Sequence, residues 1–218
     1  MSVLEKAKNK DSKFVIALDG PSASGKGLIG SMLAEEFSLV YVQSSLVYRG
    51  LAYICLQKGI SSEDSAAVIE LSRTEDVIAR IHGVDLNLEA IGEAASKLSV
   101  IPEVRENLSH YLKNLIKTTP RIIMEGRDIG TVVAPEADLK IFITADVNVR
   151  AERRFKQLRK AGKDCMLAEV LDLLKSRDQR DQQRSVAPLR AAAGALVIDT
   201  SDITSLQVIQ IIKDFISK

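Results

Sequence analysis

Tryptophan is absent from this 218-residue chain, aromatic residues make up only 4% of it, and cysteine occurs only twice. Cys55 and Cys165 lie far apart without a partner at metal-ligand spacing, which excludes a disulfide framework and favours a reducing compartment. Long apolar runs are missing too: no segment approaches the roughly 20 residues of a membrane span, and Met1–Lys13 is too polar for a signal peptide. We expect a cytoplasmic protein without a membrane partner.

An excess of charge of one sign is also lacking, since 30 basic residues stand against 29 acidic ones. Domains that bind nucleic acid usually have a pI above about 9, so no nucleic-acid partner is expected. The charges are nevertheless distributed unevenly. Ten acids and four bases lie within residues 61–109, whereas six acids and twelve bases lie within residues 150–190. A local cationic cluster in a neutral chain indicates a small anionic ligand.

Five short apolar runs predict buried strands, because they are rich in Val, Ile and Leu and do not alternate with polar residues. They are Phe14–Leu18, Leu39–Val42, Ile122–Met124, Leu139–Thr144 and Ala195–Ile198. Helical patterns separate most of them, at Gly27–Phe37, Val47–Lys58, Glu63–Leu71, Ile91–Lys97, Pro102–Ile116, Val147–Lys160, Met166–Arg184 and Leu206–Ser217. Strands that alternate with helices favour a mostly parallel α/β sheet.

Two segments interrupt this alternation. Residues 61–87 are acidic, contain one weak helical pattern and reach a turn signal at His82–Gly83, so we expect an insertion carried by the core. Residues 150–190 are highly charged and interrupted by Gly162, which fits a helical hairpin that projects from the sheet. Such hairpins are usually mobile lids or plain solvated helices.

The main chemical signal directly follows the first predicted strand. The chain there reads Gly20-Pro21-Ser22-Ala23-Ser24-Gly25-Lys26-Gly27, which matches the phosphate loop G-x-x-x-x-G-K between a strand and a helix. The glycines let backbone N–H groups turn toward phosphate oxygens, and the helix N-terminus adds partial positive charge. Lys26 supplies a full charge at the β- and γ-phosphates. The alternative is an ordinary glycine-rich turn.

Position 27 is Gly where the general motif has Ser or Thr, so the usual hydroxyl ligand of Mg²⁺ is missing. This departure argues against GTPase-like switches. No protein ligand for a metal is predicted, because His82 and His110 have no carboxylate or cysteine at ligand spacing and are expected at the surface. Asp19, beside the loop, is suited either to organise metal-bound water or to cap backbone groups.

Arginines at the ends of predicted elements suit a kinase whose acceptor is itself a phosphate. Such a kinase needs no base, because the attacking oxygen is already anionic, but it needs cations that hold two polyanions in line. A planar guanidinium can bind two phosphate oxygens at once. The candidates are Arg49, Arg105, Arg127, Arg177, Arg180 and Arg184.

Five blocks of the sequence together resemble the bacterial cytidylate kinases. In that family's order, they are Gly20–Gly27, Ser44–Arg49, Ala95-Ser96 with Pro102–Glu106, Glu125–Val133, and Arg177–Arg184 with Ala187–Leu189. The block Gly126-Arg127-Asp128-Ile129-Gly130-Thr131-Val132-Val133 is the most discriminating, because a generic phosphate-loop protein has no reason to carry it.

The resemblance implies an α/β, three-layer P-loop fold: a five-stranded parallel sheet with helices on both faces, a small insertion that binds the nucleoside monophosphate, and a helical lid. Residues 1–218 would form one kinase domain, with a core at about 14–60, 121–150 and 191–218, the insertion at about 61–109 and the lid at about 150–184. The implied reaction is transfer of the ATP γ-phosphoryl group to CMP or dCMP. We expect a monomer, since no strand edge or coiled-coil seam in the sequence demands a partner. Mg²⁺ would be carried by the nucleotide without direct protein ligands.

The resemblance also implies roles for individual residues. The ATP site would comprise Gly20, Pro21, Ser22, Ala23, Ser24, Gly25, Lys26, Gly27 and Leu28, with Arg150, Arg153 and Arg154 closing over the triphosphate. The CMP or dCMP site would comprise Ser44, Arg49, Ser96, Arg105, Arg127, Asp128, Arg177, Asp181 and Arg184. Within it, Arg49 and Arg127 would hold the phosphate, Ser96, Arg105 and Asp128 would read the cytosine edge, and Arg177 and Asp181 would contact the sugar. The implied catalytic set is Lys26, Arg127, Arg177 and Arg184.

Two features depart from the family pattern. Leu28 stands where the family normally has Thr, so a hydroxyl near the ATP α-phosphate is missing, and Thr74–Leu88 is shorter than the family's β-rich insertion. Simpler interpretations of single residues also stay open. Arg105 can be an ordinary first-turn helix residue, and Arg127 and Asp128 can form a loop ion pair with each other.

Two other functions remain as alternatives. A phosphate-loop kinase for a small metabolite would need a base at its hydroxyl acceptor, and Asp128 offers one. A nucleotide-binding module without turnover is favoured by Leu28 and by the short insertion. Such a module would bind ATP without forming ADP when an acceptor is added.

Overall fold

The fold is built on a five-stranded sheet in which every strand pairing is parallel, and the computed structural model describes residues 1–81, 83–86 and 88–217. The strands, in spatial order β2-β3-β1-β4-β5, are β1 (Phe14–Asp19), β2 (Val40–Gln43), β3 (Arg121–Gly126), β4 (Leu139–Thr144) and β5 (Leu196–Asp199). All five predicted strands are confirmed, with ends that differ by at most about two residues.

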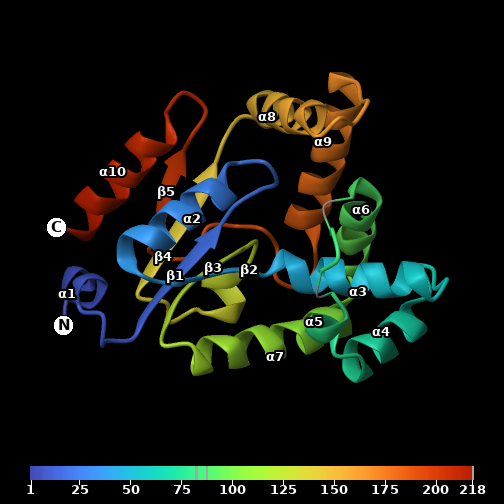
Figure 1. Ribbon diagram of the computed structural model, residues 1–218, viewed down its shortest axis with the longest axis horizontal. Coiled ribbons are helices and arrows are strands. Elements are labelled where there is room, and N and C mark those ends of the chain that lie inside the picture. The colour runs from blue at the N-terminus through green and yellow to red at the C-terminus, as the bar shows by residue number, and fades with distance from the viewer. Residues whose placement is uncertain (82, 87, 218) are drawn as a thin grey trace.

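Helices cover both faces of the sheet (Figure 1), because the central strand β1 is apolar on both sides. Phe14, Ile16 and Leu18 face the core shared with α2 (Lys26–Phe37) and α10 (Ser205–Ile216). Val15 and Ala17 face the opposite core, which is shared with α3 (Ser45–Gln57) and α7 (Pro102–Thr118). The expected three-layer arrangement is therefore confirmed.

The acidic segment after α3 is helical. It contains α4 (Ser65–Thr74), α5 (Val77–Arg80) and α6 (Glu89–Leu98), and no strand occurs among the described residues between 61 and 98. The weak helical pattern predicted there corresponds to α4. His110 is exposed on α7, as expected, whereas His82, and with it the predicted turn at His82–Gly83, lies outside the described residues.

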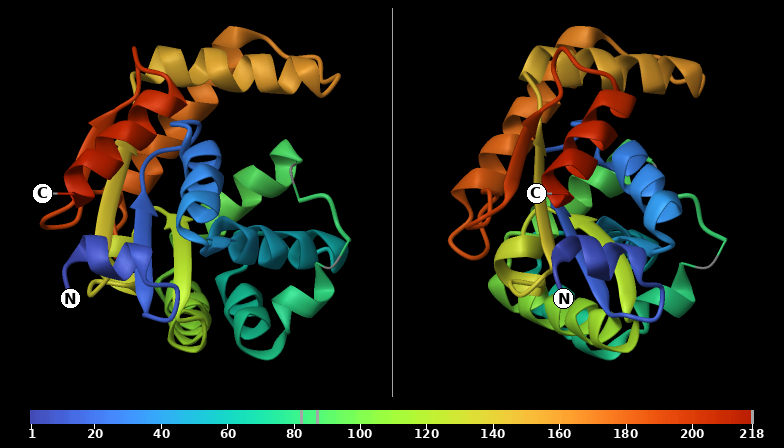
Figure 2. Two further views of the ribbon diagram at one scale, coloured as in Figure 1. Left: turned by 60° about the vertical axis from the view of Figure 1, so that its left-hand side comes forward. Right: turned by 90° about the vertical axis from the view of Figure 1, so that its left-hand side faces the viewer.

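The charged segment after β4 forms the expected hairpin of α8 (Val147–Lys160) and α9 (Leu167–Gln183). The two helices share a small apolar core of Ala151, Leu158, Val170 and Leu174. Gly162 turns the chain between them with a φ of 72°. Figure 2 shows the hairpin standing beyond the carboxyl ends of the strands. None of the helices in the described ranges is both long and apolar enough to cross a bilayer.

Three short elements were not predicted, the helices α1 (Val3–Lys8) and α5 and the π-helix η1 (Ile129–Val133). A local signal for α1 was present, because Ser2 and Glu5 form a capping box at its start. The η1 segment has no such signal, since its first N–H groups bond to Asp19, a residue 110 positions away in the sequence.

Arg121 ties α1 and α2 to the sheet. Its side chain is buried and, within the described part of the chain, forms no ion pair. The guanidinium lies 5.7 Å from the centroid of the Phe14 ring. It donates hydrogen bonds to the carbonyl oxygens of Lys6, Ala7, Asn9, Ser12 and Phe37. Several of these carbonyls lie at helix C-termini, whose partial negative charge takes the place of a carboxylate.

Replacing Arg121 with Met is expected to loosen the N-terminal segment. The carbonyls would lose a charged donor, and we expect the free energy of unfolding to fall by roughly 2–4 kcal/mol. Urea denaturation measures this change, and trypsin should cleave within residues 1–13 faster than in the wild type. Arg73→Met, at an exposed position on α4, is the control. Equal stability and equal cleavage rates in the two variants would contradict the prediction.

Candidate functional site

The loop between β1 and α2 contains three residues with a positive φ. Gly20 has a φ of 149°, and a Cβ at this position would overlap the carbonyl oxygen of Ile143 in β4. Gly25 has a φ of 95° at the N-cap of α2, and Ala23 also has a positive φ, of 60°. Only glycine allows the close approach at position 20. The predicted strand–loop–helix context of the motif is confirmed.

Lys26 is the first residue of α2 and is only 5% exposed. Its Nζ donates to the carbonyl oxygen of Pro21 at 2.6 Å and lies 3.4 Å from Ser24 Oγ. Burial, and then the nearby Arg127 guanidinium, lowers the pKa of Lys26 well below its usual value. Within the described residues this ammonium has no ion-pair partner. An anionic ligand would stabilise its charged form.

A cavity of about 540 Å³ lies between the phosphate loop and the α8–α9 hairpin. From the loop, residues 22–28 line it, whereas Gly20 and Pro21 do not. Its basic lining comprises Lys26, Arg49, Arg127, Arg153, Arg154, Lys163 and Arg177, and its apolar lining includes Leu28, Leu158, Val170, Leu173 and Leu174. Five acidic residues line it as well, namely Glu89, Glu93, Glu125, Asp164 and Glu169, so the basic side chains are in excess by seven to five. The cavity therefore suits a molecule with several negative charges and an apolar part.

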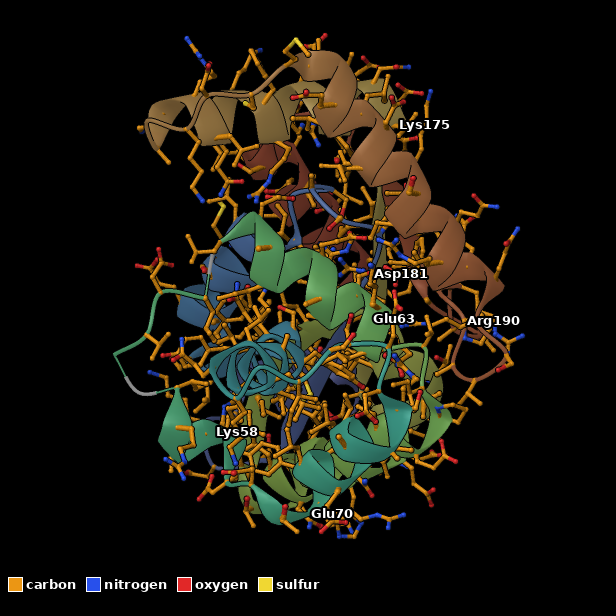
Figure 3. All side chains as sticks on the ribbon, turned by 90° about the vertical axis from the view of Figure 1, so that its right-hand side faces the viewer. Lys58, Glu63, Glu70, Lys175, Asp181 and Arg190 are labelled. Carbon is orange, nitrogen blue, oxygen red and sulfur yellow. The ribbon has the colours of Figure 1, made fainter. Side chains whose placement is uncertain are left out.

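A smaller cavity of about 50 Å³ adjoins the first. Its polar lining includes Ser44, Ser96, Arg105, Asp128, Asp181 and Arg184. Arg127 and Arg177 line both cavities, so these two guanidinium groups lie where the two compartments meet. Figure 3 labels Asp181 in the half of α9 that lies beside α6, below Lys175. Of the predicted acceptor residues, all except Arg49 line this small cavity, and Arg49 lines the large one.

Arg105 and Asp128 form a buried ion pair, with 2.5 Å between Nη2 and Oδ2. The Arg105 guanidinium also donates to the carbonyl oxygen of Ser99 at 3.1 Å and lies over the Tyr48 ring. Arg105 is therefore no ordinary first-turn residue of α7. The alternative in which Asp128 pairs with Arg127 is wrong, because each of the two has a different partner.

The partner of Arg127 is Asp181, at 3.1 Å from Nε to Oδ2, and Arg127 Nη2 also donates to Ser22 Oγ at 3.2 Å. Arg184 Nη1 lies 3.6 Å from the other oxygen of Asp181. Burial acts to raise the pKa of Asp181, but Arg127, Arg177 and Arg184 hold it below its usual value. The carboxylate thus stays ionised and neutralises part of the charge of three arginines.

Arg177 is half-buried, and desolvation followed by repulsion from Arg127 lowers its pKa to about 10. Its Nε has no hydrogen-bond partner in the described part of the chain, and the same holds for the Nε atoms of Arg105 and Arg184. Buried donors without partners are rare in folded proteins. All three arginines line the small cavity, so a polar ligand bound there would meet three unused N–H donors. Among the described residues, Arg121 Nε and Asp178 Oδ1 also lack partners but line neither cavity.

Arg49 and Ser96 have protein partners near the boundary of the cavities. Arg49 Nη1 donates to the carbonyl oxygen of Leu86 at 2.6 Å, and a Cβ at position 92 would lie 3.1 Å from Arg49 Nη2, so Gly92 keeps this space open. Ser96 Oγ accepts from Arg180 Nε at 3.2 Å, and Arg180 also pairs with Glu93 at 2.7 Å. Ser44 is buried at the N-cap of α3.

The three arginines expected at the triphosphate differ in position. Arg154 lines the large cavity and pairs with Glu89 at 2.5 Å, and Arg153 lines it while donating to Thr200 Oγ1 at 3.0 Å. Arg150 lines neither cavity and is only 5% exposed. It lies behind the phosphate loop, where it donates to the carbonyl oxygen of Ser22 at 3.2 Å.

Asp19 positions the segment that carries Arg127 and Asp128. Its two carboxylate oxygens accept from the N–H groups of Ile129 at 2.8 Å and Gly130 at 2.7 Å, at the start of η1. Of its two predicted roles, the structure therefore shows the backbone one. Burial raises the pKa of Asp19 from 3.8 to about 6, although the two backbone hydrogen bonds act to lower it.

Comparison with known proteins decides the family. A sequence model of the cytidylate kinases matches residues 16–218 of the chain. The chain belongs to the cytidylate kinase family. A cytidylate kinase of Rickettsia akari (strain Hartford) is 56% identical over 203 residues, which cover 93% of this chain and 91% of the relative. The cytidylate kinase of Rickettsia bellii (strain OSU 85-389) is 56% identical over 213 residues, 98% of this chain and 97% of the relative.

A solved gluconokinase from Sinorhizobium meliloti 1021 has a TM-score of 0.51 and 13% identity, and it covers 94% of this chain and 92% of its own. At that identity the likeness shows the fold alone. Together, the comparisons confirm the resemblance to the cytidylate kinases, the P-loop α/β fold and the classification as a nucleotide-binding transferase of the kinase type.

Ionisation of Asp19 is expected to lower the stability of the fold as the pH rises. Its pKa is raised from 3.8 to about 6 in the folded state, so its stabilising contribution is complete below pH 4 and is lost by about pH 6. Asp19→Asn cannot titrate. From pH 3.5 to pH 7, the free energy of unfolding of Asp19→Asn minus that of the wild type should rise by about 3 kcal/mol.

Urea denaturation across this pH range measures the shift. Asp11→Asn removes an exposed carboxyl group and serves as the control, for which the difference from the wild type should stay nearly constant. A difference between Asp19→Asn and the wild type that does not change with pH would show that the buried carboxyl keeps an ordinary pKa.

Proposed function

We propose that the chain transfers the γ-phosphoryl group of ATP to CMP or dCMP, producing ADP and CDP or dCDP. The observation that carries this proposal is the pair of adjoining cavities that share Arg127 and Arg177. A large cavity with an excess of basic side chains beside the predicted phosphate loop suits ATP, and the small polar cavity beside it suits a polar part of the acceptor. The family names of the relatives support the same substrates.

On the donor side, the phosphates of ATP would lie on the loop, with Lys26 at the β- and γ-phosphates and Arg153 and Arg154 closing from α8. Gly27 provides no hydroxyl ligand for Mg²⁺, and no group of three metal-ligating side chains occurs among the described residues. These residues fit a Mg²⁺ held by the phosphates themselves. When bound, this ion neutralises charge on the β- and γ-phosphate oxygens.

On the acceptor side, Arg49 and Arg127 would hold the phosphate of CMP. Arg177 and Asp181 would contact the sugar, with Arg184 and Ser44 beside them. In this pose Arg127 would give up part of its interaction with Asp181 and interact with the phosphate of CMP instead. The acceptor oxygen is already anionic at neutral pH, so no base is needed, and the shared guanidinium groups of Arg127 and Arg177 neutralise the migrating phosphoryl group.

The cytosine edge would be read by Ser96, Arg105 and Asp128. Cytosine carries an amino group at position 4, which can donate to a carboxylate such as Asp128, and acceptor atoms at positions 2 and 3, which suit a guanidinium. Uracil has a carbonyl oxygen at position 4, so this hydrogen-bond acceptor would face the Asp128 carboxylate, which is also an acceptor. Buried polar groups left unpaired in this way discriminate strongly against the wrong base.

The helical segments on either side of the cavities would close over the substrates. We propose the division stated above, with a core at about 14–60, 121–150 and 191–218, a monophosphate-binding insertion at about 61–109 and a lid at about 150–184, in a chain that acts as a monomer. Closure of the lid would exclude water that could otherwise hydrolyse ATP. The ion pairs Arg154–Glu89 and Arg180–Glu93 already join α6 to the hairpin.

The alternative of a small-metabolite kinase depends on Asp128 as a base. The Asp128 carboxylate is buried and is already engaged in the ion pair with Arg105. The structure therefore offers this alternative no free base at that position. A nucleotide-binding module without turnover is distinguished by the experiment below.

Release of ADP from ATP and Mg²⁺ is expected to require a cytidine nucleotide. With CMP, dCMP, UMP, AMP and GMP supplied in turn, CMP or dCMP should give turnover at least tenfold faster than the others, since one mismatched buried polar group is worth about 1–3 kcal/mol. Lys26→Ala should lower kcat by at least about 100-fold, because it removes a charge from the phosphates in the transition state. Binding of ATP without acceptor-dependent turnover would overturn the proposal.

Leu28→Thr is expected to lower the KM for ATP. Leu28 is 60% exposed at the wall of the large cavity, so a hydroxyl placed there can reach a phosphate oxygen without repacking the core. A hydrogen bond to a charged group is worth about 1.5–3 kcal/mol, or roughly tenfold or more in affinity. Leu28→Val has the shape of Thr without the hydroxyl and is the matched control. Equal KM values for the two variants would show that the hydroxyl is unimportant.

A further inference from the structure

Arg150 connects three separate parts of the fold. Its Nε donates to the carbonyl oxygen of Ala145 at the end of β4, at 2.9 Å, and its Nη1 donates to that of Ser22 in the phosphate loop, at 3.2 Å. Its Nη2 pairs with Oδ2 of Asp178 on α9 at 2.6 Å. Arg150 and Asp178 are 5% and 9% exposed. The guanidinium thus has protein partners on the side of the loop away from the cavity.

Thr200 makes a second connection of the same kind. It follows β5 and is only 4% exposed. Its Oγ1 lies 3.2 Å from the carbonyl oxygen of Ser24 and 3.1 Å from that of Thr144, so its single proton is shared between two carbonyls. The same oxygen accepts from Arg153 Nη1 at 3.0 Å. Helix α8 is therefore fastened to the phosphate loop through both Arg150 and Arg153.

These contacts determine the direction of the loop N–H groups. In a planar trans peptide, the C=O of one residue and the N–H of the next point in opposite directions. The carbonyl of Ser22 shares a peptide group with the N–H of Ala23, and the carbonyl of Ser24 shares one with the N–H of Gly25. Donors that hold both carbonyls from behind therefore turn these N–H groups toward the cavity, which Ala23 and Gly25 line.

The loop needs such support because part of its backbone is strained. Ala23 is a non-glycine residue with a φ of 60°, a left-handed conformation that residues with a Cβ disfavour unless their surroundings stabilise it. Asp178 provides the countercharge for Arg150, and its neighbour Arg177 lines both cavities. The same turn of α9 thus carries Arg177, which lines both cavities, and Asp178, which pairs with the arginine that holds the phosphate loop.

We infer that Arg150, Asp178 and Thr200 are positioning residues that hold the phosphate loop with its N–H groups directed into the ATP cavity and couple the loop to the α8–α9 hairpin. This inference rests on the proposed ATP site, but it is independent of the identity of the acceptor. It assigns Arg150 a place behind the loop, in contrast to the expected contact with the triphosphate.

Two conservative variants test the inference on the full chain. Thr200→Val removes the donor to Ser24 while keeping the side-chain shape, and Asp178→Asn removes the countercharge of Arg150. The matched controls are Thr118→Val, which removes an exposed hydroxyl that donates to a helix carbonyl on α7, and Glu152→Gln, which removes the exposed carboxylate of the Glu152–Lys156 pair on α8. Thr200→Ser, which keeps the hydroxyl, is the rescue variant.

The readouts are the Kd of ATP and the Kd of CMP, each measured alone by calorimetry, together with Tm. Thr200→Val and Asp178→Asn should raise the Kd of ATP five- to twentyfold and change the Kd of CMP less than twofold, whereas Thr200→Ser and both controls should match the wild type. An unchanged Kd of ATP, or equal losses for ATP and CMP that follow Tm, would overturn the inference. Because ATP binding is measured without an acceptor, it remains informative even if the wild type fails to phosphorylate CMP.

Discussion

Repulsion among the cations at the boundary of the two cavities is the constraint around which the site is organised. After burial, the charge of Arg127 is the largest influence that lowers the pKa of both Lys26 and Arg177. Buried like charges are stable only when opposite charges stand close by. In the structure Asp181 compensates Arg127 and Arg184, and Asp128 compensates Arg105. The carboxylates therefore maintain a high density of positive charge that phosphates can then share.

The topology of the sheet brings these charges together. Because β3, β1 and β4 are adjacent and parallel, the loops that follow them meet at one edge. The loop after β1 is the predicted phosphate loop, the segment after β3 carries Arg127 and Asp128, and the hairpin after β4 carries Arg153, Arg154 and Arg177. Asp19 joins the first two through the N–H groups of η1, and Arg150 joins the first to the third. The distances within the site thus depend on contacts between loops as much as on the strands.

Local patterns were sufficient to predict the strands, the phosphate loop and the hairpin, because buried runs, glycine spacing and helical periodicity act over a few residues. They were also sufficient to recognise the family, through the block around Arg127. They did not predict which aspartate pairs with which arginine, nor the place of Arg150, because these partners lie far apart in the sequence and only packing selects between them. The helix α1 is a different case, since the capping box of Ser2 and Glu5 was a visible local signal.

The sharing of Arg127 and Arg177 between the two cavities has a thermodynamic consequence. If ATP and the acceptor bind as proposed, a polyanion in either cavity would use part of the positive potential that the other cavity needs, so that occupancy of one would change the affinity of the other. Such coupling is reciprocal by necessity: whatever factor ATP imposes on the acceptor, the acceptor imposes on ATP. Because Arg127 and Arg177 line both cavities, the affinity for the donor and the affinity for the acceptor would not be independent of each other.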